Sequence, residues 1–331
     1  MTTRSTFNFT STAIAAAFFV AACGGGGGGS STGTAAATGA SAPASSTATG
    51  ANVTTPQYLA GSAQLAAFNL LNQERQQCGF PALTENTQLD SAAGAHALYM
   101  GQNGGTITDT EVAGNAGFTG ATYADRAAHF GYPTSTYAGG VSGGYYTYPA
   151  LSNTQYGQNL VYAWLSGVYH IAIGVWPVTS VGVGFNQTTF NGAPVIQSSL
   201  SIANLQPMTT SGPLTFPCQG TTGIAYEGGG ETPTPPNTSG AFGTPVAVAG
   251  NPTDTIALQS GTMTDTSGNV INLQLLDSAS DPNKLLPAFE GVAYPTAPLA
   301  PNTVYVVSIT GTVNGQAFSR SFSFTTGSFV G

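Results

Sequence analysis

The sequence predicts an α+β protein, with a mixed helix-and-strand block followed by an all-β block. Residues 56–223 carry helical periodicity in four segments and alternating apolar residues in two later ones. Helices around a small sheet favour α+β packing or a three-layer sandwich. Residues 244–331 hold only short strand-like segments between turn signals, which favours a β-sandwich. A chain of 331 residues agrees with about two domains at ~150 residues each.

The first two predicted helices have clear apolar faces. Residues 64–78 present one apolar stripe and meet a stop signal at Gly79. That stripe consists of Leu65, Phe68 and Leu71. Residues 89–100 have the strongest helical spacing in the chain. It is carried by Leu89, Ala92, Ala93, His96, Ala97 and Met100.

Two further helices and two strands complete the first block. Residues 122–130 begin with a capping box from Thr122 to Asp125. Residues 153–171 form the fourth predicted helix, with an apolar face made of Tyr156, Leu160, Trp164 and Val168. Alternating residues then predict strands at 180–186 and 194–204.

Residues 224–243 are predicted to be a linker, because "EGGGETPTPPNTSG" is rich in Pro, Gly and Thr. The strands expected after it are residues 256–258, 270–276, 304–310 and 318–324. Asn314-Gly315 lies between the last two and is a strong type I′ hairpin signal.

The N-terminus predicts export. Arg4 precedes an apolar run at residues 13–22, which suits a signal peptide and is too short to span a bilayer. The run ends in "VAAC", which resembles a lipobox, so residues 1–22 are the expected signal peptide and Cys23 the lipidated residue. The alternative is an ordinary signal peptide followed by a chance cysteine. Residues 23–55 are then a flexible tether. Loss of Arg4 would leave four basic and 13 acidic residues, a net charge of −9.

Charge and cysteine content agree with an exported protein. Only 5% of the residues are charged, against a usual share of about 25%, and the excess of acids excludes a basic patch for nucleic acid. If Cys23 carries lipid, Cys78 and Cys218 remain. Two cysteines in an oxidising compartment indicate one disulfide, from Cys78 to Cys218.

Residues 64–203 resemble the CAP superfamily, also called SCP/PR-1-like, in its bacterial form. The resemblance rests on the order and spacing of "NQERQQCGFPAL", "LDSAAGAHALYM", "GFTGATYADRAAHFGY", "WLSGVYHIAIG" and "VGVGF". It implies an α-β-α sandwich. The C-terminal block, with "PLAPNTVYVVSITGTVNG" and "FSFTTG", resembles a bacterial Ig-like domain.

The resemblance also implies a cleft with two histidines and acidic residues that often binds a divalent metal. His170 matches the second histidine, Asp109 stands at the position of the first, and Gly140 stands where an acid is expected. Because two cleft positions depart from the family, a degenerate cleft is the favoured interpretation. The alternative is a metal site that uses His170 and Asp109 with zinc or calcium.

Other candidate residues have mainly structural interpretations. His96 lies on an apolar helix face and is expected to be a buried, hydrogen-bonded ring. Arg126 is expected to serve as scaffold, and Asn72 and Arg75 to hold a loop. The tyrosine-rich stretch around residue 146 is either a ligand-binding loop or a surface loop with tyrosines folded back. Its candidate ligand residues are Tyr145, Tyr146 and Tyr148.

The favoured function is a cell-surface lipoprotein whose CAP-like domain binds an extracellular or cell-envelope ligand without catalysis. The lipid on Cys23 would hold it in the bacterial envelope, at the outer membrane in a Gram-negative cell. One alternative is a divalent-metal-dependent hydrolase that uses His170 and Asp109. Another is a lipid- or sterol-binding protein.

Overall fold

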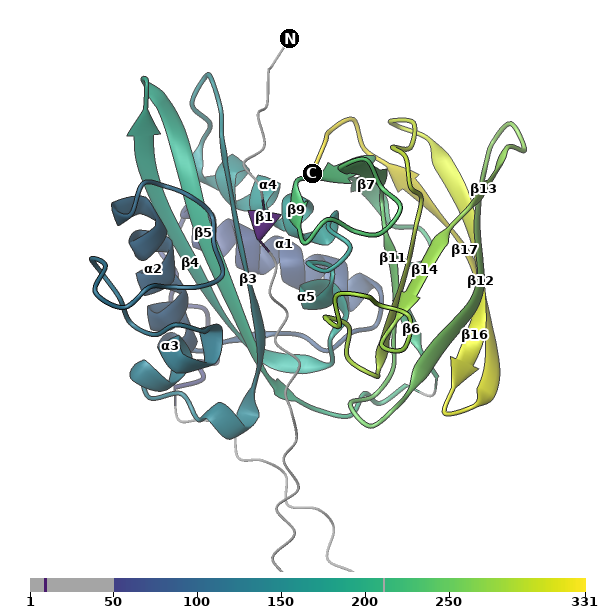
Figure 1. Ribbon diagram of the computed structural model, residues 1–331, viewed down its shortest axis with the longest axis horizontal. Helices are drawn as coiled ribbons and strands as arrows, with labels where there is room; N and C mark the ends of the chain where they lie inside the picture. Colours follow the sequence, from purple (N-terminus) through teal and green to yellow (C-terminus); the bar gives the residue numbers. More distant parts are fainter. Residues whose placement is uncertain (1–8, 11–50, 211) are drawn as a thin grey trace, which may run out of the picture.

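The computed structural model describes residues 9–10, 51–210 and 212–331 and has an α+β fold (Figure 1). Most of the predicted signal peptide, the lipobox Cys23 and most of the tether lie outside the described residues. A two-residue strand, β1 (Phe9–Thr10), pairs with β9 (Glu231–Thr232). Among the described residues, no helix has the length and apolar character needed to cross a membrane.

The first part of the chain is built on a four-stranded sheet with the order β2-β4-β5-β3. Its strands are β2 (Thr84–Glu85), β3 (Tyr137–Tyr146), β4 (Val178–Phe190) and β5 (Ala193–Leu205). β4 and β5 form a long antiparallel hairpin across Asn191 and Gly192. Both turn residues have positive φ, 48° and 79°, which suits a tight hairpin turn. The two strands predicted from alternation are therefore confirmed, and both are longer than expected.

Helices cover both faces of this sheet (Figure 1). One face carries α2 (Thr87–Gln102) and α3 (Tyr123–His129). The other carries α1 (Ala63–Gln77), α4 (Asn153–Leu165) and the short α5 (Ala172–Val175). A one-turn helix, η1 (Thr134–Thr136), precedes β3. α2 packs so closely on the sheet at Gly182 and Gly184 that a Cβ atom at either glycine would collide with the helix backbone.

Three of the four predicted helices agree with the structure to within two residues at each end, and the predicted capping box of α3 is present. The fourth was predicted too long. α4 ends at Leu165, where the Ser166 hydroxyl donates to the Ala163 carbonyl, and α5 resumes at Ala172. The backbone between them bonds to a carboxylate from the C-terminal region instead of continuing the helix.

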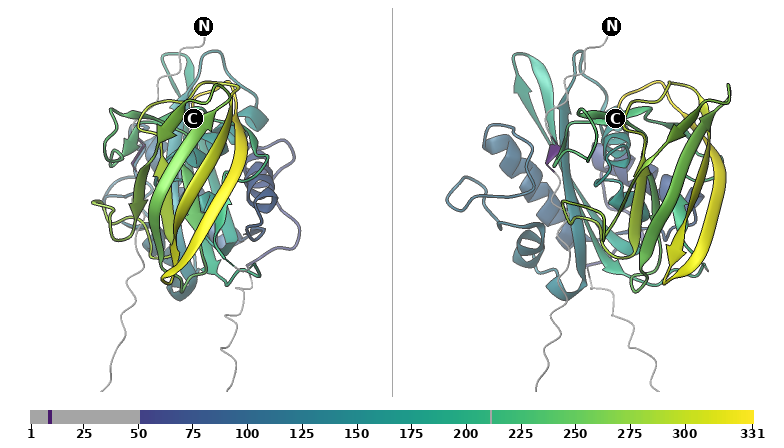
Figure 2. Two further views of the ribbon diagram at one scale, coloured as in Figure 1. Left: turned by 90° about the vertical axis from the view of Figure 1, so that its right-hand side faces the viewer. Right: turned by 45° about the vertical axis from the view of Figure 1, so that its right-hand side comes forward.

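The C-terminal region is a two-sheet β-structure. One sheet contains β6 (Leu214–Phe216), β11 (Val246–Ala249), β15 (Glu290–Tyr294) and β14 (Gln274–Asp277). The other contains β13 (Val270–Asn272), β12 (Ile256–Asp265), β16 (Val304–Val313), β17 (Gln316–Thr326) and β7 (Thr222–Ile224). Figure 2 shows this second sheet on the outer side of the molecule. Asn314 and Gly315 form the predicted hairpin turn between β16 and β17.

The two halves of the chain are more closely joined than the sequence predicts. β6 and β7 precede residue 225, yet they pair with C-terminal strands. The predicted linker contains β8 (Glu227–Gly229), β9 and β10 (Ala241–Gly243), and β8 pairs with β10. A single apolar core extends through both halves. Residues 224–243 are therefore built into the fold and do not form a free connection.

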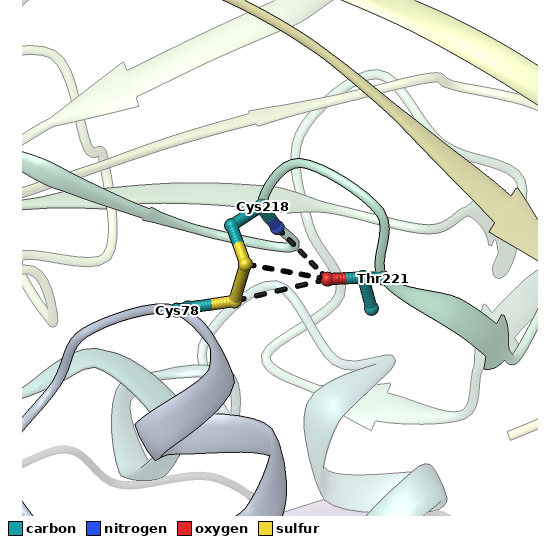
Figure 3. The surroundings of a disulfide bond; sticks show 3 residues. All are labelled: Cys78, Cys218 and Thr221. Atoms are coloured by element: carbon teal, nitrogen blue, oxygen red, sulfur yellow. Dashed lines mark hydrogen bonds between the residues drawn. A yellow bond between two sulfur atoms is a disulfide. The ribbon is translucent and has the colours of Figure 1, made fainter.

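The predicted disulfide is confirmed, and it joins the two halves (Figure 3). Cys78 caps the C-terminal end of α1, and Cys218 follows β6 of the C-terminal sheet. Their Cα atoms are 5.4 Å apart, within the usual range for a disulfide. Thr221 lies beside the bridge and accepts a hydrogen bond from the Cys218 backbone N–H.

Candidate functional site

His170 lies in the turn between α4 and α5, where the C-terminal region covers the CAP-like part of the chain. The side chain of Glu231 closes this turn from outside. Its carboxylate accepts the backbone N–H groups of Val168, Tyr169 and His170 at 2.8, 2.7 and 3.0 Å. The carboxylate thus satisfies three backbone N–H groups that carbonyls would satisfy in a continuous helix.

The His170 ring is almost fully enclosed, with 3% of the residue exposed. Its Nδ1 lies 3.8 Å from Glu231 Oε1. Burial lowers the pKa of His170 to about 3, so the ring is neutral near neutral pH. Burial raises the pKa of Glu231 to about 7, although its three backbone donors favour the charged form. The close approach also requires Gly167, because a Cβ there would lie 2.7 Å from Glu231 Oε1.

Two more buried carboxylates of the C-terminal region hold the same segment. Glu290 accepts the indole N–H of Trp176 at 2.7 Å, and Asp281 accepts the Tyr169 hydroxyl at 3.0 Å. Burial raises the pKa of Glu290 to about 8. We call this set the junction. It consists of Glu231, Asp281 and Glu290 with Tyr169, His170 and Trp176.

Arg75 holds the segment from the α1 side. Its guanidinium donates to the carbonyls of Ile173, Trp176 and Val178 at 2.8 to 3.2 Å. It also donates to Pro81, so the prediction that Arg75 holds a loop is confirmed. Residues 168–178 are thus held between α1 and the C-terminal region. His170 lies in this segment, among residues whose contacts support the fold.

Asp109 lies in the loop after α2 and is buried. Its carboxylate accepts the Tyr123 hydroxyl at 2.5 Å, and that hydroxyl also lies 2.5 Å from Ser142 Oγ. Burial and the Asp109 carboxylate raise the pKa of Tyr123. The Asp109 carboxylate thus bonds to Tyr123 of α3, whereas His170 lies beside Glu231 of the C-terminal region.

Gly140, the position at which the family resemblance expects an acid, faces the same tyrosine. A Cβ atom at Gly140 would collide with the Tyr123 ring. The ring therefore fills the space that an acidic side chain would need. Within residues 9–10, 51–210 and 212–331, no three His, Cys, Asp or Glu side chains come close enough together to hold a metal ion.

His96 belongs to a separate buried network that fixes the loop between α2 and α3. Its Nδ1 lies 2.9 Å from Glu111 Oε1, and its Nε2 lies 2.7 Å from the Thr108 carbonyl. Glu111 also accepts the backbone N–H groups of Thr119 and Gly120. Burial lowers the pKa of His96, and the hydrogen bond to Glu111 opposes this. The prediction of a buried, hydrogen-bonded ring is confirmed.

Arg126 completes this network as scaffold. Its guanidinium donates to the carbonyls of Gly120 and Asp109 at 3.2 and 2.9 Å and lies 3.8 Å from Glu111. The predicted scaffold role is therefore confirmed. His96, Glu111 and Arg126 thus use their polar atoms in hydrogen bonds within the protein.

The three candidate tyrosines divide between core and surface. Tyr145 and Tyr146 are part of β3, so the prediction of a loop is wrong at these positions. Tyr145 is buried and donates to the Tyr156 carbonyl at 3.0 Å. Tyr148 follows the strand and is 73% exposed. Of these three residues, Tyr148 has the exposure expected of a ligand contact.

Three functional positions, Glu231, Asp281 and Glu290, were not predicted from the sequence. Glu231 lies in the stretch predicted to be a linker, and the other two lie between short predicted strands. One signal was present in the composition. The chain has only 13 acidic residues, so an individual acid is less easily explained as a general means of keeping the surface soluble. Their burial without basic partners could not be deduced from spacing.

Comparison with known proteins supports the resemblance of the first block. Residues 68–197 match the CAP family, described as the cysteine-rich secretory protein family. None of the curated proteins matches the chain. The solved structure of an outer surface protein from Borrelia burgdorferi is similar at 16% sequence identity and a TM-score of 0.32, covering 43% of this chain and 92% of that one. Residues 68–197 are thus a CAP family domain, and the β-rich region after β5 lies outside that match.

Proposed function

We propose that the protein is an exported interaction module of the cell envelope, in which the CAP domain binds a ligand and performs no catalysis. The observation that carries the proposal is the burial of His170 at the junction under Glu231. A catalytic histidine must reach its substrate and exchange a proton with it near the working pH. His170 is 3% exposed, and its pKa is lowered to about 3.

The second cleft position supports the same conclusion. The Tyr123 ring occupies the space beside Gly140, and the Asp109 carboxylate is engaged by the Tyr123 hydroxyl. A metal-dependent hydrolase that uses His170 and Asp109 would need both side chains turned toward one ion and a substrate. The hydrogen bond from Tyr123 to Asp109 and the burial of His170 beside Glu231 argue against that arrangement.

The remaining features suit presentation at a surface. A lipid on Cys23 and the tether of residues 23–55 would hold the folded part away from the membrane. The Cys78–Cys218 disulfide and the junction then make the CAP domain and the β-rich region one unit. The β-rich region, which we take to be an Ig-like domain, would serve as a rigid spacer.

Co-sedimentation with isolated envelopes of the producing bacterium tests this function. The purified protein is expected to bind saturably, and a folded His170→Ala variant should bind as well as wild type because the wild-type ring is buried. Cys23→Ser should move the protein from the membrane fraction to the soluble fraction in cells. Absence of saturable binding, or hydrolase activity abolished by His170→Ala, would contradict the proposal.

A further inference from the structure

The outer end of the β4–β5 hairpin carries the exposed Phe190, and the exposed Tyr148 follows the end of the neighbouring strand β3. Phe190 pairs with Ala193 across the turn, and the Thr147 N–H donates to the Pro194 carbonyl at 3.3 Å on the other side of β5. The next residue of that chain, Tyr148, is thereby brought beside Ala193. We call Tyr148, Phe190 and the intervening residues 191–193 the aromatic tip.

The register places the Phe190 side chain on the α2 face of the sheet. Side chains alternate along a strand, and directly paired residues share a face. Gly182 and Gly184 of β4 face α2, so Phe190 faces the same side. α2 ends at Gln102, and Gly101 near its end packs on Asn186 and Thr188. Phe190 therefore lies beyond the helix, and Figure 1 shows the hairpin end projecting past α2.

Both aromatic residues are exposed far more than a core or lid residue would be. Tyr148 is 73% exposed and Phe190 is 67% exposed. They flank the middle strand, so their backbones are separated by about two strand spacings, ~10 Å. Large exposed aromatic residues that lie together mark a binding surface more often than isolated ones do.

The stretch of chain that forms the tip is uncharged. Between Arg126 and Glu227 the sequence contains no Asp, Glu, Lys or Arg. Below Phe190, Asn186 donates to Gln197 at 2.7 Å, and Gln197 donates to Thr188 at 2.9 Å. Aromatic rings beside amide and hydroxyl groups, with no charge, complement a neutral partner rich in hydroxyl groups and C–H faces.

The tip also lies at the pole opposite the tether. The N–H of Thr87 donates to the Ala51 carbonyl, and Asn52 bridges to Asn86, so the chain enters the fold next to β2. β2 pairs with β4 at Ser180 and Val181. From Val181 to Phe190 the strand rises about 30 Å at ~3.4 Å per residue. A domain held at the tether end therefore presents the aromatic tip outward.

We propose that the aromatic tip binds a neutral polysaccharide chain, with the Phe190 and Tyr148 rings stacked on successive sugars. This inference rests on the proposed envelope-binding function and names its ligand class. A lipid surface fits less well, because membrane-binding surfaces combine a larger apolar area with basic residues. The tip has no basic residue, and the mature chain has an expected net charge of −9.

Affinity electrophoresis of the full chain tests the proposal directly. The native gels contain hydroxyethyl cellulose, dextran or laminarin as neutral probes, and phosphatidylcholine vesicles serve as the lipid probe in sedimentation. At least one neutral polysaccharide should retard the wild-type protein. Phe190→Ala with Tyr148→Ala should weaken that binding at least tenfold, whereas Tyr148→Phe should retain it. Val270→Ala, at an exposed apolar position of β13, is the matched control and should bind as wild type.

Three results would overturn the proposal. The first is a wild-type protein that none of the neutral polysaccharides retards. The second is a double variant that binds as tightly as wild type. The third is vesicle binding that depends on the two rings while the polysaccharide gels show no effect. Envelope co-sedimentation of the double variant distinguishes failure of the envelope-binding function from failure of the aromatic-tip proposal. If the double variant still sediments with envelopes, the envelope-binding function stands and the aromatic tip is not its binding surface.

Discussion

Glu231 is the residue on which the junction depends most, because one buried carboxylate accepts three backbone N–H groups beside His170. No basic side chain is needed, since backbone dipoles stabilise its charge. The same residue explains why α4 stops at Leu165. A contact between residues 63 positions apart decides this helix end, so sequence periodicity around residue 165 could not reveal it.

Removing this carboxylate should cost a large part of the stability. Glu231→Ala leaves three buried N–H donors without acceptors, and we expect a loss of ~3 kcal/mol or more in the free energy of unfolding, at about 1–3 kcal/mol for each unsatisfied group. Glu231→Gln keeps one acceptor oxygen and should lose less. Urea unfolding measures both, with Glu227→Gln as the control. Equal stability of Glu231→Ala and wild type would show that the turn does not depend on Glu231.

The buried carboxyls also predict how stability varies with pH. In the folded protein the pKa of Glu231 is about 7 and that of Glu290 about 8, above the value of 4.5 for an exposed Glu. The folded protein therefore holds these two protons more tightly than the unfolded chain does. The stability that this difference contributes is lost as the pH rises through the folded-state pKa values of about 7 and 8. His170, with a lowered pKa, has the opposite effect only below about pH 6.5.

The melting temperature should therefore fall as pH rises from 6.5 to 8.5. Glu290→Gln keeps an acceptor for the Trp176 N–H and removes one titrating group, so its melting temperature should fall less over this range. Calorimetry at half-unit pH steps, with Asp265→Asn as an exposed control, makes the comparison. A Glu290→Gln variant with the same pH slope as wild type would show that Glu290 does not titrate in this range.

At the scale of the elements, the sequence predicted those whose pattern is local. The first three helices follow from apolar spacing and caps, and the β4–β5 hairpin follows from alternation. β3 was missed because its glycines hide the alternation. Those glycines are required by long-range packing, since a Cβ at Gly140 or Gly144 would collide with Tyr123 or Ile107. Such packing cannot be read from the strand itself.

Restoring the family acid should therefore damage the fold. Gly140→Glu forces a side chain into the Tyr123 ring, and overpacking of this kind costs about 1–3 kcal/mol. Tyr123→Ala removes the ring, so Gly140→Glu should cost less stability in that background than in wild type. A double-mutant cycle from urea unfolding measures this coupling. Additive effects of the two changes would mean that Tyr123 does not fill this space.

At the scale of the whole molecule, the sequence predicted the order of the mixed block and the all-β block. It did not predict that the two blocks share β-sheets and a core. The compositional change after Cys218 indicates an all-β region. The pairing of β6 and β7 with later strands depends on contacts across more than 30 residues. The Cys78–Cys218 disulfide was expected because only these two cysteines remain after Cys23. The structure shows in addition that it joins the CAP domain to the C-terminal sheet.

The disulfide should contribute strongly to this union, because the bridged cysteines are 140 positions apart. Closing a loop of that size is worth about 5 kcal/mol in the chain-entropy model. Replacing both cysteines by alanine should lower the free energy of unfolding by a comparable amount. Denaturant unfolding of the double variant beside the reduced and oxidised wild type tests this. A double variant as stable as the oxidised protein would rule out this contribution.

The central claim is that the CAP domain binds a ligand and that His170 is a structural part of the junction. Metal content tests it most directly. The protein and its His170→Ala variant are incubated with zinc, calcium and other divalent ions, desalted, and measured by elemental analysis. We predict no stoichiometric metal that depends on His170. One equivalent retained by wild type and lost in His170→Ala would contradict the account and support a metal-dependent hydrolase.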